Sequence, residues 1–342
     1  MKKIENTKKP NFFKKIFIKF CRIVGFEIID QSNLYLPTSE KLATENLASL
    51  SKKIINVPLG ETKISRQVKS LDIIIKTCTS VNLVTQNKKR IFEKDKSEYT
   101  LRTINSIKKS LIFNKDFLKK IKTKIYIIDY NSKREDIKKI KELLSETNIS
   151  FEIINLKPDE YKQIKTLDKN NPTIEGNMKA TMASIHKSLL IAKEKCEDLI
   201  YFVEDDYIHK KESLFEIVST YEKIASEQNK DLFICPVDYP YLYKKFNYSN
   251  IYIGNKYHWR SVSESLLTFL TSKSLLDKYW LDLKLMSEYE HSPFETPLHK
   301  IYENELCISP IPSLAMHCTN VNSIFGLSPN IDWKKLWDEN EN

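Results

Sequence analysis

Glycine is scarce in this chain of 342 residues, which contains only 5, and three glycine-containing signatures are missing altogether. No GxxxxGK motif ending in Ser or Thr is present, which argues against a P-loop phosphoryl transferase, and no GxGxxG follows a strand to bind a dinucleotide. A GxSxG nucleophile elbow is also absent. Glycine this sparse argues equally against a flexible linker protein, and the 41% hydrophobic and 29% charged composition is that of a globular domain.

Long apolar runs and paired cysteines are absent too. No apolar stretch approaches the roughly 18–20 residues that a membrane-spanning helix needs, and basic residues interrupt the first apolar segment, which argues against a cleavable signal. The cysteines lie far apart without a CxxC pair, which favours reduced thiols in a cytoplasmic protein over a disulfide frame or a zinc site. They are Cys21, Cys78, Cys196, Cys235, Cys307 and Cys318.

The formal net charge of +10 is concentrated at the N-terminus. The first 25 residues contain eight basic side chains and one acidic side chain, so the other 317 residues carry a net charge of only +3. A body so nearly balanced in charge argues against a nucleic-acid partner.

The same N-terminal segment predicts an amphipathic helix, bounded by Pro10 and Gly25. Its apolar residues have the spacing of one helix face, and four basic residues fall largely off that face. The apolar residues are Phe12, Phe13, Ile16, Phe17, Phe20, Ile23 and Val24, and the basic ones are Lys14, Lys15, Lys19 and Arg22. Because an aromatic face flanked by cations suits an anionic membrane surface, we expect residues 1–30 to hold the protein on the inner face of the cell membrane. The alternative is a helix that packs on the body.

Apolar runs alternate with helical patterns from residue 71 onward. Strand-like runs lie at 71–79, 124–129, 149–156 and 198–203, and helix-like segments lie at 97–113, 134–146 and 177–196. Such alternation predicts an α/β fold, a mostly parallel, Rossmann-like sheet with helices on both faces. We expect this domain to span residues 71–325, after a linking or wrapping segment at 31–70 and before a C-terminal tail at 326–342.

Ligands of open parallel sheets bind beyond the carboxyl ends of the strands. Three consecutive carboxylates, Glu204, Asp205 and Asp206, directly follow the apolar strand LIYFV. Neighbouring like charges repel, and a hard divalent cation such as Mg²⁺ or Mn²⁺ relieves that repulsion. Alternate residues of an extended segment face the same way, so Glu204 and Asp206 can address one ligand while Asp205 points elsewhere. The competing interpretation is a solvated acidic turn in which Asp205 or Asp206 caps the next helix.

The run IYFVEDDYI resembles the DxD segment of GT-A glycosyltransferases, particularly the large inverting family 2. The family has an apolar strand followed by an acid, any residue and a second acid, and here Glu204 replaces the usual first Asp. The resemblance implies that Glu204 approaches the ribose or diphosphate of a nucleotide-sugar donor, and that Asp206 binds the metal. It covers about residues 71–320.

Three further segments resemble the family in the same order along the chain. IIDYNS matches the strand-end motif with Asp129 as the nucleoside-contacting acid, although Tyr130 departs from the second acid. The helix beginning GNMKA lacks the usual Arg, and Asn177 or Lys179 stands near its place. In PFETPLHKIYENELCISPIPSLAMH, Glu295 occupies the place of the general base, and His317 lies where some GT-A enzymes have an additional metal ligand.

Each of these residues also has a purely structural interpretation. Glu295 follows Pro293 at a helix start, where the helix dipole favours an acid, and a lone His317 in an apolar setting is often a satisfied core residue. In the segment HWRS, Arg260 suits a phosphate through its forked donors and Trp259 a sugar ring, or the two form a surface ion pair and a packed aromatic.

These patterns and the resemblance predict a metal-dependent glycosyltransferase that moves a sugar from a nucleotide-diphosphate donor to a hydroxyl acceptor, in cell-surface glycan or glycolipid synthesis, with inversion implied by the family. Glu295 is the predicted base, and Asp206 and His317 are the predicted ligands of Mn²⁺ or Mg²⁺. The predicted donor-binding residues are Thr77, Thr79, Asp129, Asn131, Asn177, Glu204, Asp205 and Arg260. The alternatives are a nucleotidyltransferase on a related fold and a catalytically silent, membrane-associated interaction protein.

Overall fold

The computed structural model describes residues 12–26, 53–56, 60–80, 90–157, 161, 163–167, 172–244, 248–319 and 323–342. The chain divides into two units, Met1–Lys63 and Ile64–Asn342. Most of the segment 31–70 that the sequence assigned to a linker lies outside the described residues.

The first unit contains one described helix and a two-stranded antiparallel sheet. Helix α1 (Phe12–Ile23) has the predicted bounds, and the chain leaves it through Gly25 at a φ of +88°, a conformation in which a side chain would be strained. Strands β1 (Lys53–Asn56) and β2 (Gly60–Lys63) pair with each other. No helix in the described parts of the chain is long and apolar enough to cross a membrane.

Four parallel strands form one half of the nine-stranded sheet in the second unit, in the order β5-β4-β3-β6. Their positions confirm the four predicted strands. They are β3 (Ser70–Thr77), β4 (Lys122–Asp129), β5 (Ser150–Asn155) and β6 (Leu199–Val203). Strands β3 and β6 are almost wholly buried, which explains why β6 is a continuous apolar run and why three isoleucines, 73–75, follow one another in β3 instead of alternating with polar residues.

The other half of the sheet is mixed. The order continues from β6 through β11-β8-β12-β10-β9, in which only β8 and β12 are parallel neighbours. These strands are β8 (Phe233–Ile234), β9 (Ile251–Ile253), β10 (His258–Ser261), β11 (Phe269–Ser272) and β12 (Cys307–Ile311). A separate antiparallel pair joins β7 (Tyr207–His209), the next strand in the chain after β6, to β13 (Ala315–His317).

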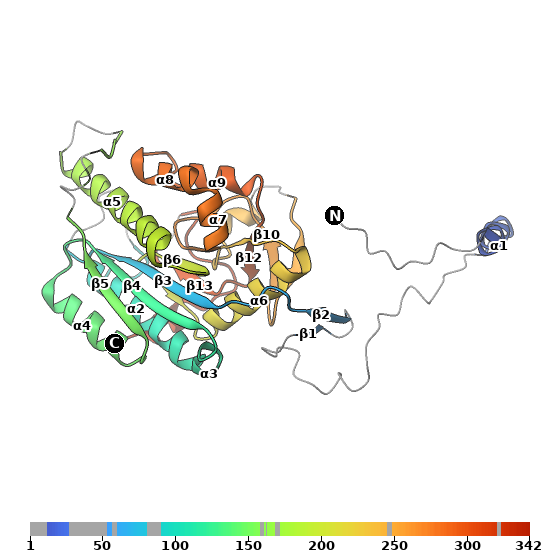
Figure 1. Cartoon of the computed structure of the whole chain (residues 1–342), viewed down its shortest axis with the longest axis horizontal. Helices are drawn as coiled ribbons and strands as arrows, with labels where there is room; N and C mark the ends of the chain where they lie inside the picture. The colour runs from blue at the N-terminus through green and yellow to red at the C-terminus, as the bar shows by residue number, and fades with distance from the viewer. Residues whose placement is uncertain are drawn as a thin grey trace. The chain divides into compact units, whose positions relative to one another are not determined.

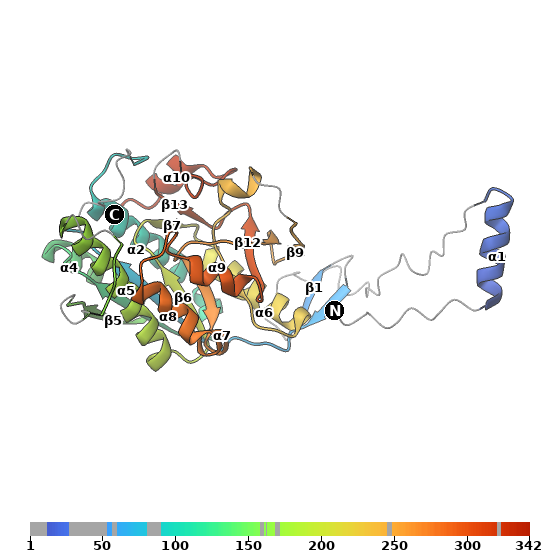
Figure 2. The same cartoon turned by 90° about the horizontal axis from the view of Figure 1, so that it is seen from above.

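Helices cover both faces of the large sheet, as the sequence predicts (Figures 1 and 2). One layer holds α5 (Pro172–Lys195), α7 (Lys273–Lys278), α8 (Trp280–Glu288) and α9 (Thr296–Tyr302). The opposite layer holds α2 (Lys96–Phe113), α3 (Lys115–Leu118) and α4 (Arg134–Ser145), and α2 also contacts α6 (Ser213–Gln228). A short 3-10 helix, η4 (Pro240–Tyr243), and α10 (Trp333–Asp338) complete the described elements.

The predicted C-terminal tail packs into the second unit. Leu336 and Trp337 of α10 belong to a buried cluster with Tyr99 of α2, and Arg102 donates a hydrogen bond of 2.6 Å to the carbonyl oxygen of Trp337. Burial of this aromatic surface makes residues 333–340 part of the folded body rather than an extension of it.

The strand order fixes where a ligand can bind. The chain passes outward from β3 to β4 and β5, then returns to the other side of β3 as β6. Such a reversal opens a crevice at the carboxyl ends of the two strands beside it. Thr77 ends β3, Asp129 ends β4 and Glu204 follows β6, so three predicted site residues stand at this one edge.

Candidate functional site

The acidic turn Glu204-Asp205-Asp206 connects β6 to β7, and its three carboxylates have different partners. Each of them lies against a cation of the chain itself: Lys76 for Glu204, Lys96 for Asp205, and Arg90 for Asp206. The sequence predicted a metal here because the three carboxylates repel one another. In the structure, basic side chains of the protein already offset that repulsion. Metal binding at this turn has to be argued from geometry instead.

Asp205 has hydrogen-bond partners that the other two carboxylates do not share. Its Oδ1 pairs with Lys96 at the start of α2, and its Oδ2 accepts hydrogen bonds from the backbone N–H of Cys78 at 3.1 Å and from the Thr100 hydroxyl at 3.0 Å. Burial acts to lower the pKa of Lys96, but Asp205 and Asp206 outweigh it and the pKa is raised. Asp205 thus ties β6, α2 and the loop after β3 together.

Asp206 lies beside His317, which β13 brings from more than a hundred residues away. The β7–β13 register places His317 opposite Tyr207, and the His317 Nε2 is 3.7 Å from the Asp206 Oδ2. The His317 Nδ1 donates to the carbonyl oxygen of Phe325 at 2.7 Å, and its ring stacks on Tyr207 at 4.5 Å. This orientation directs Nε2 toward the carboxylate.

The charges of this pair stabilise each other. Burial acts to raise the pKa of Asp206, but the nearby His317, Lys96 and Arg90 outweigh it, and the pKa is held well below its usual range. For His317 burial acts to lower the pKa, while Asp206 and Glu204 raise it above its ordinary value. The pair brings a carboxylate oxygen and an imidazole nitrogen close together.

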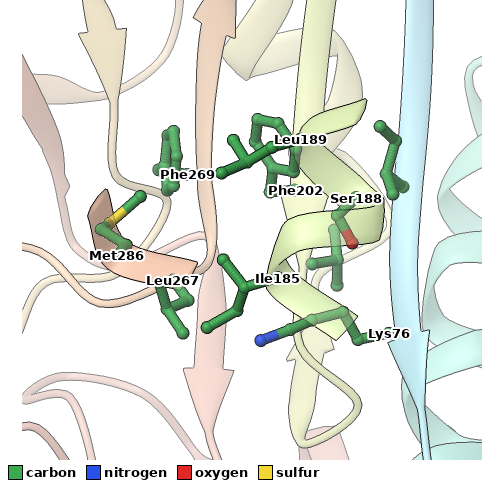
Figure 3. A pocket seen from close by; sticks show the side chains of 10 residues that line it. Lys76, Ile185, Ser188, Leu189, Phe202, Leu267, Phe269 and Met286 are labelled. Carbon is green, nitrogen blue, oxygen red and sulfur yellow. The ribbon is translucent and has the colours of Figure 1, made fainter. Parts of the chain in front are cut away.

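Glu204 is held by Lys76 and by Thr268. The Lys76 ammonium lies 3.2 Å from Oε1, and the backbone N–H of Glu204 donates to the Thr268 hydroxyl at 3.0 Å. Lys76 also lines a cavity of about 20 Å³ between the sheet, α5 and α8, whose other walls are apolar except for Ser188 (Figure 3). A space of that size holds about one water molecule. It is an imperfection of interior packing rather than a sugar or nucleotide site.

Glu295 is a buried carboxylic acid whose pKa is shifted toward neutrality. It directly precedes α9, is only 7% exposed, and burial together with the charge of Glu204 raises its pKa to about 7. Lys76 and His317 act in the opposite direction. The shift shows that Glu295 lies within electrostatic reach of the residues around the acidic turn, although it is 91 positions from Glu204 in the sequence.

The loops after β3 and β4 are joined by side chains that the sequence singled out. The Thr77 hydroxyl donates to the Asp129 Oδ1 at 2.8 Å, and the Asp129 Oδ2 accepts from the backbone N–H of Ser132 at 3.3 Å. The hydroxyl of Thr79 accepts from the backbone N–H of Lys133 at 2.9 Å. Asn131 has a φ of 55° and its carbonyl accepts from Ser80. These contacts shape one rim, and a nucleoside contact by Asp129 or Asn131 stays a prediction.

The predicted donor-binding residue Asn177 lies on α5. Asn177 is in the first part of α5, where its neighbour Met178 packs against the same apolar cluster as Tyr130 and Phe294. Tyr130 follows Asp129 in the chain, and Phe294 precedes Glu295. The start of α5 therefore lies near the loop after β4 and near the start of α9.

Arg260 and Trp259 on β10 have partners within the protein. Arg260 donates to the buried Asp238 and lies 4.5 Å over the ring of Tyr243, so its phosphate contact stays a prediction. Trp259 is fully buried, with its indole nitrogen 3.4 Å from Glu216. The idea that Trp259 forms a platform for a sugar ring is wrong, because β10 turns this side chain into the core.

Arg90 and Lys96 were missed by the sequence analysis. Arg90 belongs to no regular element, and Lys96 begins a helix whose pattern only indicated an amphipathic face. Nothing in their local sequence distinguishes them from the other basic residues of a lysine-rich chain. Only the tertiary structure, which brings Arg90 and the start of α2 beside the acidic turn, shows that they join Lys76 as its cations.

Comparisons with known proteins found matches among solved structures, all at low identity. No family model matches the chain, and no curated protein matches it. Among solved structures, S. aureus TarS (residues 1–349) is 12% identical with a TM-score of 0.33, over 61% of this chain and 48% of that one, so this chain spans about half of its length. The galactosyltransferase LgtC with donor and acceptor sugar analogs is 10% identical with a TM-score of 0.34, over 70% of this chain and 86% of that one.

A UDP-glucose pyrophosphorylase complexed with UDP-glucose is 8% identical with a TM-score of 0.37, over 80% of this chain and 98% of that one. These are similarities of fold at low identity.

Proposed function

We propose that this chain is a glycosyltransferase of the GT-A type that transfers a sugar from a nucleotide-diphosphate donor to a hydroxyl acceptor. One observation carries the proposal: a buried carboxylic acid with a pKa of about 7, Glu295, lies within electrostatic reach of Glu204 and of His317, which pairs with Asp206 directly after β6, beside the reversal of strand order. The reaction needs two components. One is a group that accepts a proton near pH 7, and the other is a pair of side chains that can bind the metal.

The residues fit a divalent metal as two of its ligands. Two atoms bound to one Mg²⁺ at about 2.1 Å lie about 3 Å apart when adjacent and about 4.2 Å apart when opposite. The 3.7 Å between the Asp206 Oδ2 and the His317 Nε2 exceeds the separation of adjacent ligands, so the two side chains would have to approach each other to bind one ion. Within the described residues no group of three or more His, Cys, Asp or Glu side chains forms a metal site. Asp206 and His317 would therefore hold Mn²⁺ or Mg²⁺ together with phosphate oxygens of the donor, and the ion would neutralise charge on the departing diphosphate.

Glu295 acts as the general base in this proposal. With a pKa of about 7, a large fraction of the carboxyl is ionised at neutral pH, yet it remains basic enough to take the proton of an acceptor hydroxyl. A single displacement with such a base inverts the configuration of the sugar carbon. Asp205 is assigned no chemical role, because its two oxygens are engaged by Lys96, Thr100 and Cys78.

The donor is proposed to lie across the carboxyl ends of β3, β4 and β6. Its nucleoside adjoins the rim formed by Thr77, Thr79, Asp129 and Asn131, and its diphosphate approaches Glu204 and Asp206. The first part of α5, with Asn177, closes this side of the site. The arrangement follows the reversal of strand order at β3.

The acceptor is proposed to belong to a cell-surface glycan or a lipid-linked intermediate, because α1 suits a membrane surface. Phe13, Phe17 and Phe20 are 77%, 60% and 60% exposed, and Lys19 and Arg22 are exposed on the same helix. Apolar side chains that insert at the interface and cations that attract anionic lipids act together in such helices. The enzyme is accordingly placed on the cytoplasmic face of the membrane.

Transfer is tested by screening nucleotide sugars for a thermal shift in the presence of Mn²⁺ or Mg²⁺, followed by product analysis with the best donor. The Asp206→Ala variant should lose the metal-dependent shift, whereas Asp116→Ala, an exposed acid on α3, should retain it. If no nucleotide sugar shifts the wild type, the proposal fails. Release of pyrophosphate rather than a nucleoside diphosphate would instead identify a nucleotidyltransferase.

Membrane docking is tested by co-sedimentation with phosphatidylglycerol-containing vesicles and with phosphatidylcholine vesicles. Replacing Phe17 and Phe20 by Asp should release the protein from the anionic vesicles without changing donor hydrolysis. The double variant Ile112→Asp with Phe113→Asp, which places the same two charges on exposed apolar residues of α2, should leave binding unchanged. Unaltered binding of the α1 variant would contradict the docking proposal.

A further inference from the structure

Arg90 has hydrogen-bond donors that the described protein does not use. Its terminal nitrogens Nη1 and Nη2 are both buried, and neither has a hydrogen-bond partner among the described residues. The guanidinium lies 4.4 Å over the ring of Tyr99, and its Nη2 is 3.9 Å from the Asp206 Oδ2, beyond hydrogen-bond length. A buried cation with open donors is unfavourable unless a ligand engages them.

The surroundings of Arg90 indicate what such a ligand is. Lys76 and Lys96 already donate to Glu204 and Asp205, whereas the guanidinium of Arg90 lies over the ring of Tyr99 with its Nη2 3.9 Å from the Asp206 Oδ2. A planar guanidinium matches two oxygens of a phosphate group, and hydrogen bonds of this kind are among the strongest that a protein forms.

A second argument comes from charge. A divalent ion on Asp206 and the guanidinium of Arg90 would share one carboxylate, and two cations so placed repel each other. An anion with several oxygens between them removes the repulsion, because it can bind the ion and the guanidinium at once. A diphosphate has this shape and charge, and a neutral sugar or a nucleobase does not.

We propose that Arg90 is a binding residue for the diphosphate of the donor and remains on the nucleoside diphosphate as it leaves. This inference rests on the proposed function, since it assigns a residue to that same site. A purely structural Arg90, stacked on Tyr99 beside the cluster of α10, would affect stability but not the affinity for an anion.

The decisive experiment uses inorganic pyrophosphate, which has the diphosphate chemistry without a base or a sugar. Its affinity is measured by titration calorimetry on the full chain, with and without Mg²⁺. Arg90→Gln should weaken binding at least about tenfold, because a charge-assisted, two-pronged contact is lost. Arg134→Gln removes the same charge at an exposed position at the start of α4 and should leave the affinity unchanged.

A second measurement needs no variant and covers the case in which Arg90→Gln does not fold. Wild-type protein is treated with an arginine-specific dicarbonyl, and modification is followed peptide by peptide by mass spectrometry. Pyrophosphate should protect Arg90 and not Arg134. Equal pyrophosphate affinity in folded Arg90→Gln, or modification of Arg90 at the same rate with and without pyrophosphate, overturns the inference.

The outcomes separate this inference from the proposed function. If nucleotide sugars are used by Arg90→Gln with unchanged KM, the enzyme is a transferase and Arg90 is not its diphosphate residue. If pyrophosphate binds through Arg90 but no nucleotide sugar is consumed by the wild type, the anion site stands and the transferase proposal fails. If the wild type binds neither pyrophosphate nor any nucleoside diphosphate, both fail.

Discussion

Asp205 and Asp206 are neighbours in the acidic turn, yet we expect Asp205→Asn to act mainly on folding. The substitution leaves Lys96 buried without its charged partner and turns an amide –NH₂ toward the donors of Cys78 and Thr100. Removing one partner of a buried ion pair costs about 3–5 kcal/mol. At about 2–4 °C for each kcal/mol in a domain of this size, the melting temperature should fall by roughly 6–20 °C.

The assay is thermal unfolding followed by circular dichroism, with Asp116→Asn as the control. Asp116 forms an exposed pair with Lys119, so its substitution should leave the melting temperature unchanged. The double variant Lys96→Met with Asp205→Asn should recover part of the loss, because no unpaired charge remains. A melting temperature of Asp205→Asn equal to that of the wild type, or a double variant no better than the sum of the singles, would refute the reasoning.

Three further predictions concern the base, the metal and a loop of the mixed half of the sheet. The kcat/KM for transfer should rise with pH through about 7, where Glu295 loses its proton. The Glu295→Gln variant should lose transfer but still bind the donor. If that variant kept the pH profile of the wild type, Glu295 would be excluded as the base. Replacing His317 by Gln should raise the Mn²⁺ concentration for half-maximal transfer at least about tenfold, and superimposable Mn²⁺ titrations would refute the ligand role. Glu216→Ala removes the carboxylate that accepts hydrogen bonds from three backbone N–H groups at 255–257. The free energy of unfolding of this variant, measured in urea, should be about 3 kcal/mol lower than that of the wild type. Glu227→Ala, at an exposed position of the same helix, is the control and should leave the free energy of unfolding unchanged.

The same carboxyl, Glu295, makes stability depend on pH in a definite direction. Its pKa in the folded protein is raised to about 7 from an ordinary value of 4.5, so the folded state favours the protonated form. The resulting stabilisation is fully present below about pH 4.5 and is lost as the pH rises through about 7. Glu295→Gln should therefore flatten the stability profile across this interval, as urea unfolding at several pH values would show.

Much of the parallel half of the fold could be predicted from the sequence. Strand β6, the isoleucines 73–75 of β3 and residues 125–129 of β4 are buried, and burial on both faces requires consecutive apolar residues, which are visible in the chain without knowledge of their partners. The mixed half was not predicted in detail, because its strands have two to five residues and include polar segments such as HWRS. Segments so short have no period that distinguishes them from loops.

The sequence by itself determined the alternation of strands and helices, and with it the edge of the sheet at which Thr77, Asp129 and Glu204 stand, because each residue directly follows or ends a strand. The tertiary structure alone decided which of the acidic residues are engaged and by what. Lys96 and Arg90 come from a helix start and a loop more than a hundred positions before the turn, and His317 comes from a strand more than a hundred positions after it. Contacts over such separations depend on how layers pack, and no local pattern of residues encodes them.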